Sequence, residues 1–516
     1  MNLIFEQWIP IRRADGSREK IFPWEMTKDI DDEHRRIVAI ASPRPDFDGA
    51  LIQFLIGLLQ TTCTPPDKMT WRKWRKAPPS ADELKARFET VAFAFELEGE
   101  KAFMQDFSPS ELPNKSEIAA LLIETPGDHT ELLNKDHFIK RGLINSLCPH
   151  CAALSLFSLQ INAPLGGQGN RTGLRGGGPL TTLVLGNTLW ETSWLNILIK
   201  ANYQDDESEH DNLENRFPWL SKTRTSEAKP PAGITTPIDV HPDQQFWATP
   251  RRIRLISVSD HESKFCSVCG SSTELMFNEF HNKNYGANYQ GFEHSLSPHY
   301  IKDGSTLTTH PQSGGIGYRH WLGLIVNTTE GNTLHKPAKV VEQFRSLVRE
   351  DARLWAFGYD MDNMKARCWY DATMPILLVP EGFEDIFKGM AERLVRAADW
   401  VSSVLRGYIK DAMFGESDTR GDLSFVQQHF WSATEGPFYN HVRRLRDELS
   451  EPENEQSLLV SWRNALRESS LSIFDHYAQN GDFDAVEPRQ IAVARNNLSK
   501  MLNGKKLHDL LGLPKP

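Results

Sequence analysis

The stretch FEDIFKGMAERLVRAADWVSSVLRGY, residues 383–408, marks the point at which the pattern of the sequence changes. Its apolar residues recur three and four positions apart, which is the spacing of one face of an amphipathic α-helix. Three further helical stretches, separated by polar or glycine-containing breaks, cover residues 421–448, 456–480 and 487–511. Gly436 and Pro437 fall inside the first of these and should kink or shorten that helix. Four helices of similar length with short connections predict an antiparallel four-helix bundle over residues 380–516.

Residues 1–375, which precede the bundle, show a different pattern. Short runs rich in β-branched residues, such as 180–185 and 252–258, are set among helical patches and frequent Gly and Pro breaks. We therefore predict an α+β fold, in which a large, irregular mixed N-terminal domain precedes the all-α bundle. Within the first domain, residues 205–237 are rich in charge, Ser, Thr and Pro, and we expect them to form a long surface insertion.

The composition is that of an ordinary globular protein, and it sets limits on function. Of 516 residues, 39% are hydrophobic and 24% are charged, and the longest apolar run, near residues 51–59, is too short to span a bilayer. The first ten residues lack the basic start and apolar core of a signal peptide, so we expect a cytoplasmic protein without membrane contact. The net charge of -10 argues against a surface that coats nucleic acid throughout, so such contact must be local or shared with basic partners.

Two CxxC pairs give the sharpest local signal. Cys148-Pro-His-Cys151 and Cys266-Ser-Val-Cys269 are separated by residues 152–265, and each pair offers two thiolates at a spacing that suits one metal ion. Together the four sulfurs would close a structural zinc site that leaves no coordination position for a substrate. Such a site would hold two distant segments together, and metal binding would contribute to the free energy of folding. The alternative is that the four cysteines remain reduced thiols without a metal.

Two enzymatic interpretations use the same cysteines. Cys-Pro-His-Cys also occurs in the active sites of oxidising thioredoxin-fold proteins, but such oxidases are exported and the second CxxC pair would have no role. A zinc deaminase combines HxE with PCxxC, and His129-Thr-Glu131 precedes the first pair, although Leu147 stands where the proline would be. A zinc-dependent nucleic-acid enzyme of this kind, with Glu131 as general base, is therefore the alternative function. The sequence contains no HExxH, GxSxG or Walker motif.

A glycine-rich run and a basic cluster are candidates for contact with nucleic acid. The run Gly166-Gly-Gln-Gly-Asn-Arg-Thr-Gly-Leu-Arg-Gly-Gly-Gly178 would let the main chain approach a partner closely, and Arg171 and Arg175 add charge suited to phosphate. A turn that serves only packing is the alternative for this run. The cluster Trp71-Arg-Lys-Trp-Arg-Lys76 could meet a phosphate backbone through its cations and rings, or could be an ordinary solvated helix.

Several segments, taken in order, resemble the CasA family, the large subunit of the type I-E CRISPR surveillance complex called Cascade. The resemblance spans nearly the whole chain, and the order of the segments makes it specific. The segments are Asn2-Leu-Ile-Phe-Glu-Gln-Trp-Ile-Pro10, Phe103-Met-Gln-Asp106, Leu147-Cys-Pro-His-Cys-Ala152, Thr172-Gly-Leu-Arg-Gly-Gly-Gly-Pro-Leu-Thr-Thr182, Cys266 to Gly270, Gly358-Tyr-Asp-Met-Asp-Asn-Met-Lys-Ala-Arg367 and the helical C-terminus.

The resemblance implies a subunit without enzymatic activity in an RNA-guided antiviral complex. Such a subunit tests double-stranded target DNA for the short protospacer-adjacent motif and starts strand separation, while base pairing with the guide RNA reads the remaining sequence. It also recruits the helicase-nuclease that degrades the target. The partners implied are therefore the other Cascade subunits, the CRISPR guide RNA, target double-stranded DNA and the helicase-nuclease effector.

The resemblance also implies which residues meet nucleic acid. In the family a glycine loop approaches the motif through the minor groove, which here corresponds to Gly166, Gly167, Gln168 and Gly169, with Arg171 nearby. A groove-reading family lysine falls on Asn284, with Lys283 beside it. A family hairpin wedges into the duplex and maps onto residues 360–364, where Asn363 replaces the usual glutamine and Met364 would insert between base steps beside Asp362. Phosphate would repel Asp360 and Asp362, so such a wedge must face bases, and an ordinary hairpin turn is the alternative. A loop that contacts the handle of the guide RNA corresponds to Leu132, Leu133, Asn134 and Lys135.

Overall fold

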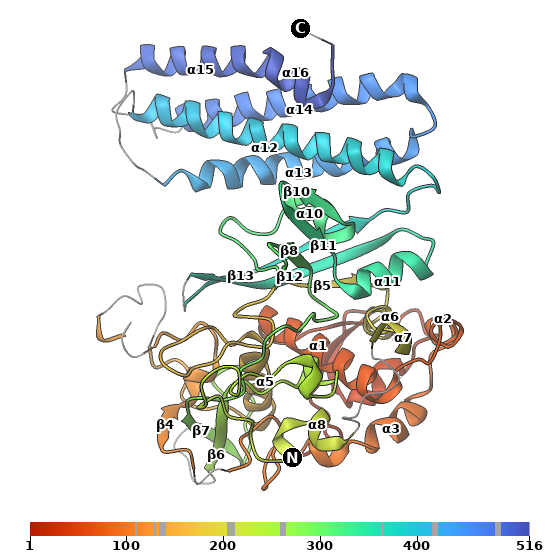
Figure 1. Cartoon of the computed structure of the whole chain (residues 1–516), viewed down its shortest axis with the longest axis vertical. Coiled ribbons are helices and arrows are strands. Elements are labelled where there is room, and N and C mark those ends of the chain that lie inside the picture. The colour runs from red at the N-terminus through yellow and green to blue at the C-terminus, as the bar shows by residue number, and fades with distance from the viewer. Residues whose placement is uncertain are drawn as a thin grey trace. The chain divides into compact units, whose positions relative to one another are not determined.

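The computed structural model describes most of the chain and divides it into two compact units (Figure 1). The described residues are 1–108, 111–127, 131–133, 141–203, 212–258, 265–362, 365–414, 422–479 and 487–514. The first unit comprises Met1–Pro311, Thr329–Val348 and Arg353–Asp371. The second comprises Gln312–Thr328, Arg349–Ala352 and Ala372–Pro516. Each unit has its own core.

The core of the first unit is built around helix α1 (Pro45–Cys63), which packs against α5 (Pro149–Asn162). Both helices are apolar on nearly all sides, as expected for helices that are enclosed by other elements. Phe54 lies at the centre of an aromatic cluster in which its ring centroid is 5.2–6.1 Å from five neighbours. These neighbours are Trp8, Phe95, Phe103, Phe157 and Trp247. They join segments from the first 250 residues into a single core.

Short sheets surround this core. They have the strand orders β2-β1-β3, β4-β7-β6, β13-β12-β5 and β10-β11-β8-β9. The runs at 180–185 and 252–258, predicted as strands, form β5 (Thr181–Leu185) and β6 (Arg252–Val258). The remaining strands are β1 (Ile9–Arg13), β2 (Arg18–Ile21), β3 (Ile37–Ile40), β4 (Asn114–Glu117), β7 (Met276–Lys283), β8 (His299–Lys302), β9 (Ser305–Thr308), β10 (Thr328–Glu330), β11 (Thr333–Lys336), β12 (Ala352–Asp362) and β13 (Lys365–Ile376).

The other helices of the first unit are short. They are α2 (Lys68–Lys76), α3 (Ala81–Glu89), α6 (Leu189–Leu195), α7 (Lys200–Tyr203), α8 (Leu213–Arg216), α9 (Gln244–Trp247) and α11 (Lys339–Leu347). None of the helices in the described part of the chain combines the length and apolar character needed to cross a membrane.

The prediction of a surface insertion over residues 205–237 is wrong for part of that segment. Residues 204–211 lie outside the described residues, but Phe217, Trp219 and Leu220 are buried. The indole nitrogen of Trp219 donates a hydrogen bond to the carbonyl of Ala94 at 2.7 Å, and its ring joins the aromatic cluster. The segment is polar on average, so the three apolar residues that attach it to the core were not recognised in the sequence.

The second unit contains the C-terminal helices, which lie side by side in Figure 1. They are α12 (Glu384–Phe414), α13 (Ser424–Asp447), α14 (Pro452–Gln479), α15 (Pro488–Leu502) and α16 (Lys505–Leu511). The α+β class with a C-terminal helical bundle is therefore confirmed. The fourth predicted helix is two helices, because Gly504 begins a new helix after α15 ends. Pro437 lies inside α13 without ending it, so the helix is not shortened there, and the other expected effect, a kink, stays a prediction.

A helix from earlier in the chain joins this bundle. Helix α10 (Tyr318–Ile325) belongs to the second unit, and the ring of Tyr318 stacks on Phe438 with a centroid separation of 4.2 Å. The hydroxyl groups of Tyr318 and Thr434 are 2.9 Å apart. The position of α10 in this unit was not predicted from the sequence, because the periodicity of eight residues is too short to indicate which core the helix joins.

Candidate metal centre and nucleic-acid interface

The first CxxC pair is positioned by the start of helix α5. Cys148 is the residue before the helix, Pro149 occupies the first helical position, and Cys151 lies in the first turn. Proline is favoured at this position because it has no backbone N–H to leave unpaired and its φ angle suits a helix. The second pair lies in a tight turn, in which the backbone N–H of Gly270 donates to the carbonyl of Cys266 at 2.9 Å. Each pair therefore presents its two sulfurs from a short, hydrogen-bonded segment.

Backbone hydrogen bonds bring the two pairs together. Leu147 and Phe277 exchange two N–H···O bonds of 2.9 Å each, and the N–H of Ser267 donates to the carbonyl of Ser146 at 2.8 Å. The hydroxyl oxygen of Ser267 also accepts a bond from the N–H of Asn145 at 3.1 Å. The segments before α5 and before β7 are thus joined by main-chain contacts, so the cysteine cluster does not depend on side chains alone.

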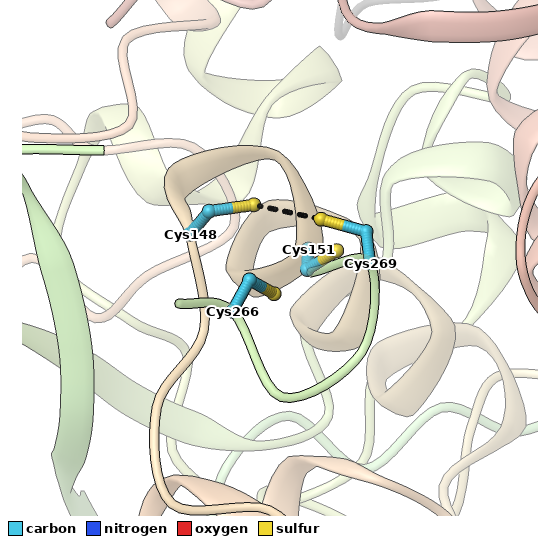
Figure 2. A group of neighbouring side chains, drawn as sticks. All are labelled: Cys148, Cys151, Cys266 and Cys269. Atoms are coloured by element: carbon cyan, nitrogen blue, oxygen red, sulfur yellow. Dashed lines mark hydrogen bonds between the residues drawn. The ribbon is translucent and has the colours of Figure 1, made fainter. Parts of the chain in front are cut away.

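The geometry of the four sulfurs fits a tetrahedral metal ion such as zinc (Figure 2). The sulfurs of Cys148 and Cys269 are 3.6 Å apart, and all four sulfurs lie within 4.8 Å of one another. Zn–S bonds of about 2.3 Å in a tetrahedron place sulfurs roughly 3.8 Å apart. Cys148, Cys151 and Cys266 are buried and Cys269 is half-buried. Within the described residues, this is the one group of three or more His, Cys, Asp or Glu side chains with metal-ligand spacing.

Hydrogen bonds within the cluster separate the acidities of the thiols. Hydrogen bonding with Cys148 lowers the pKa of Cys269 and lowers that of Cys266 to about 6. The same kind of contact with Cys148 raises the pKa of Cys151. Some of these thiols can ionise only by keeping others protonated, because neighbouring thiolates repel one another. A divalent cation would remove this conflict and allow all four to act as thiolate ligands.

Four sulfur ligands would leave no position for substrate, which argues against a deaminase-like site. His129, the histidine that such a site requires, lies outside the described residues. Glu131 is described, and its backbone carbonyl accepts a hydrogen bond from Arg141 at 2.8 Å. His150 lies between the first two cysteines, but its Nδ1 is 3.1 Å from the amino group of Lys20, and burial lowers its pKa to about 4.

The glycine loop lies beside the end of strand β7. The carbonyl of Gln168 accepts a hydrogen bond from the side-chain amide of Asn284 at 2.6 Å. The carbonyl of Gly169 accepts one from the N–H of Tyr285 at 2.7 Å. The structure thus brings together two of the predicted segments, Gly166 to Gly169 and Lys283 to Asn284, although they are far apart in the sequence.

The glycine-rich run has two parts with different roles. Gly167 and Gly169 have left-handed backbones, with φ of +60° and +76°, and Gly167 is exposed. An added Cβ at Gly166 or Gly167 would have no neighbour closer than 3.7 Å. An added Cβ would lie 2.7 Å from the ring of His310 at Gly176, and 2.7 Å from the carbonyl oxygen of Tyr359 at Gly178. The second half of the run is therefore close packing, whereas the first half presents main chain to the outside.

The charged residues near this loop are already engaged within the protein. Arg171 donates two hydrogen bonds to Ser226, at 2.7 and 3.1 Å, and lies over the ring of Tyr285. Lys283 forms an ion pair with Glu227 at 3.3 Å. The prediction that Arg175 provides charge for phosphate is wrong. It is buried, donates to Thr181, Ser297 and Gln53, and burial lowers its pKa to about 9.

The predicted wedge hairpin corresponds to β12 and β13, which are neighbours in one sheet. Asn363 and Met364 connect them and lie outside the described residues. Asp360 is buried, and Arg367 binds its carboxylate through two hydrogen bonds of 3.0 and 2.7 Å. Arg367 also lies 3.6 Å from the carboxylate of Asp362. One arginine therefore contacts both acidic residues and offsets one of their two negative charges, which reduces the expected repulsion between this hairpin and phosphate.

Arg367 was not among the predicted site residues, although the sequence contained a signal for it. In a hairpin closed by the two residues 363 and 364, positions 360 and 367 face each other across the strands. Opposite charges in such facing positions stabilise the pairing.

Arg367→Ala should loosen the hairpin. The variant leaves the Asp360 carboxylate buried without its bidentate partner, which we expect to cost about 1–3 kcal/mol of local stability, since Arg367 itself is partly exposed. Faster hydrogen exchange of the β12 and β13 amides would show the effect. Arg353→Ala, at an exposed position on the neighbouring strand β12, is the control. Equal exchange rates in the two variants would contradict the assigned role of Arg367.

The predicted guide-RNA loop is only partly described. Leu132 and Leu133 are exposed, at 78% and 44%. Asn134 and Lys135 lie outside the described residues.

The cluster at residues 71–76 forms helix α2 and is partly structural. Trp71 is buried, and its indole nitrogen donates to the carbonyl of Ile197 at 2.9 Å. Arg72 donates to the carbonyl of Leu347 at 3.0 Å, and Arg75 pairs with Glu191 at 3.5 Å. Lys73 and Lys76 are exposed. The helix thus has an anchored face and a basic outer face.

Comparison with known proteins gives consistent matches over the full length. The family model of the CRISPR-associated protein Cse1 matches residues 2–473. The crystal structure of CasA from Thermus thermophilus is similar, with 18% identity, 99% of each chain covered and a TM-score of 0.69. Cse1 from Thermobifida fusca has 16% identity, with 99% of this chain and 98% of that chain covered, and a TM-score of 0.69. A chain of a CRISPR RNA-guided surveillance complex in a pre-nicking state has 17% identity, with 98% of this chain and 99% of that chain covered, and a TM-score of 0.58.

Proposed function

Because the chain belongs to the CRISPR-associated Cse1 family, we propose that it is the large subunit of an RNA-guided surveillance complex and recognises the flank of target DNA. The resemblance to the CasA family is confirmed by the family match over nearly the whole chain. In this proposal the protein binds without turnover. Its partners are the other Cascade subunits, the guide RNA, target double-stranded DNA and the helicase-nuclease that it recruits.

The observation that carries the proposal is the contact between the glycine loop and the end of β7. The hydrogen bond from Asn284 to Gln168 holds the loop in one position, and the open side of Gly166 and Gly167 leaves room for a DNA backbone or base edge. A surface of main chain and amides suits the minor groove, where the pattern of donors and acceptors is degenerate. We therefore expect tolerance for several related flank sequences.

The hairpin supports the second step, the start of strand separation. Its strands are long, and β12 is largely buried, so the hairpin has a rigid base. Arg367 offsets one of the two negative charges of Asp360 and Asp362, which weakens the repulsion between this base and phosphates. In the proposal Asn363 and Met364 enter the duplex beside the flank.

Zinc in the cysteine cluster has a structural part in this function. The ion would be held by Cys148, Cys151, Cys266 and Cys269, and it would join the start of α5 to the segment that leads into β7. Since β7 ends at the glycine loop, the site would help to position the DNA-reading residues.

The decisive experiment is DNA binding by the guide-loaded partner complex with and without this chain. Matched duplex targets carry a correct or a scrambled flank. We expect tight, salt-dependent binding only when the chain and the correct flank are both present, because phosphate contacts provide affinity and loop contacts provide discrimination. Binding that is indifferent to the chain would refute the proposal. Detection of a deaminated product in the same reactions would favour the zinc-enzyme alternative.

A further inference from the structure

A pocket of about 580 Å³ lies between helices α2 and α3, in the first unit. Its lining includes Thr62, Lys73, Trp74, Pro79, Arg87 and Thr90. The volume falls within the range of roughly 300–1,000 Å³ that is typical of small-ligand sites. None of the functions proposed above uses this pocket.

The pocket presents an oriented planar cation. The guanidinium of Arg87 lies over the indole of Trp74, 4.7 Å from the ring centroid. Trp74 is itself held by Trp194, whose ring centroid is 5.1 Å away. A guanidinium that stacks on a fixed ring keeps its outer face and its N–H groups available for an anion or for a base.

The cations of the pocket, Arg87 and Lys73, form no ion pair in the part of the chain that the structure describes. The carboxylate of Glu83 interacts electrostatically with both cations but pairs directly with neither. Glu83 is the acidic residue of the lining, but its carboxylate accepts hydrogen bonds from the N–H and the hydroxyl of Ser80, at 2.7 and 3.0 Å. These bonds form the N-terminal cap of α3 and lower the pKa of Glu83. The two cations are therefore available to an external anion.

Helix α2 continues this positive charge beyond the pocket. Five of its nine residues are Lys or Arg and none is acidic. Lys68, Lys73 and Lys76 are exposed. In a chain of net charge -10, such a local concentration of cations is the kind of feature that phosphate binding requires.

We propose that this pocket and the outer face of α2 bind single-stranded nucleic acid. One phosphate lies between Lys73 and Arg87, and an unpaired base packs against Pro78, which also lines the pocket, and the outer face of Arg87, while Lys68 and Lys76 contact neighbouring phosphates. A base pair within a duplex could not enter the pocket, whereas an unstacked nucleotide can. The contact is independent of base identity, since it uses ring faces and phosphates. The inference extends the proposed function, because target recognition by such a complex generates an unpaired strand.

The test measures the binding of fluorescein-labelled oligothymidylate to the isolated full-length chain by fluorescence anisotropy, at a series of salt concentrations. The variants are Lys73→Gln, Arg87→Gln and the double variant. The control is Lys85→Gln, which also removes one positive charge from α3. Lys85 does not line the pocket, because its side chain pairs with Glu89 and lies over the ring of Trp24. Arg87→Lys keeps the charge but loses the planar fork.

We expect the double variant to bind about tenfold or more weakly, and its salt slope to fall by about 0.7, since the one phosphate between Lys73 and Arg87 is lost and each phosphate contact contributes about 0.7 for single strands. Lys85→Gln should bind as the parent does, and Arg87→Lys should recover part of the affinity. If the double variant does not fold, the single variant at exposed Lys73 serves alone, with weaker binding and a slope change of at most about 0.7, because Arg87 still contacts the phosphate. Unchanged affinity and slope would overturn the proposal, and so would tighter binding of polyglutamate than of oligothymidylate.

The same variants separate this inference from the proposed function. Flank-dependent duplex binding by the assembled complex should persist in the double variant, because the pocket residues are not those of the glycine loop. Loss of oligothymidylate binding with normal flank discrimination supports both. If the parent chain binds oligothymidylate but gives no flank discrimination in the complex, the proposed function fails and the pocket assignment stands.

Discussion

Cys266→Ala is expected to release the metal and to destabilise the first unit. Release of the metal removes its whole contribution to the free energy of folding, which is roughly 10–16 kcal/mol for structural zinc in small peptides and so comparable to the stability of a domain. The backbone bonds of Ser267 and Leu147 remain possible in the variant, but without the metal they must hold the two segments by themselves. We expect loss of zinc by elemental analysis, a lower melting temperature, and reduced solubility or assembly with the partner subunits.

Cys368→Ala provides the matched control. Cys368 is a half-buried cysteine on β13 outside the cluster, so its replacement removes a thiol without touching the metal site. It should keep the zinc content and the melting temperature of the parent. A Cys266→Ala protein with the parent's melting temperature and normal assembly would show that the cluster does not stabilise the fold.

Gly169→Leu is expected to weaken flank-dependent duplex binding by about tenfold or more. The left-handed backbone at this residue costs a side-chain-bearing residue about 1–2 kcal/mol. An added Cβ would also lie 3.0 Å from Asn284 and from the ring of Tyr285, so the loop must move away from β7. Movement of the loop would change the surface offered to the DNA. The measurement is the affinity of the assembled complex for duplexes with correct and scrambled flanks.

Two further glycines distinguish the causes of this effect. Gly16→Leu introduces a side chain at a left-handed position with no neighbour within 4 Å, far along the chain from the loop, and should leave DNA binding unchanged. Gly166→Ala adds a methyl group where the nearest atom is 3.9 Å away and no backbone strain arises. If DNA approaches the loop closely, Gly166→Ala should also weaken binding. Parent-like affinity in both Gly166→Ala and Gly169→Leu would remove the loop from the recognition mechanism.

The parts of the fold that the sequence predicts well are those with strong local periodicity. The helical stretch that begins near residue 383 and the strands at 181–185 and 252–258 need only nearest-neighbour spacing to be recognised. The break at Gly504 and the place of α10 in the second unit depend on contacts between distant residues, which periodicity does not contain. The buried anchor at Trp219 was missed because three apolar residues are averaged out within a long polar segment.

In the candidate site, too, local sequence patterns predicted some features, whereas others depend on contacts between distant residues. The four cysteines were predicted from spacing, and the structure places their sulfurs together. The glycine loop and Asn284 were placed in one interface by family resemblance, and their hydrogen bond is a tertiary contact that no local pattern encodes. Arg175 and Arg171 look alike in the sequence, but only Arg175 is enclosed by the core. The charge of an arginine in a sequence therefore does not indicate whether it can reach a phosphate.

Strand β7 runs from the cysteine cluster to the glycine loop. Near its start, Phe277 pairs with Leu147 beside the cysteines, and just after its end, Asn284 holds Gln168. The seven residue steps from Phe277 to Asn284 span about 23 Å at the usual rise of about 3.3 Å per residue. A shift at the cysteine end would be carried along the strand, which is paired on both sides by β4 and β6. Under the proposed function, loss of zinc from the cysteine cluster would then weaken discrimination between foreign and own DNA from a position about 20 Å along the strand from the glycine loop.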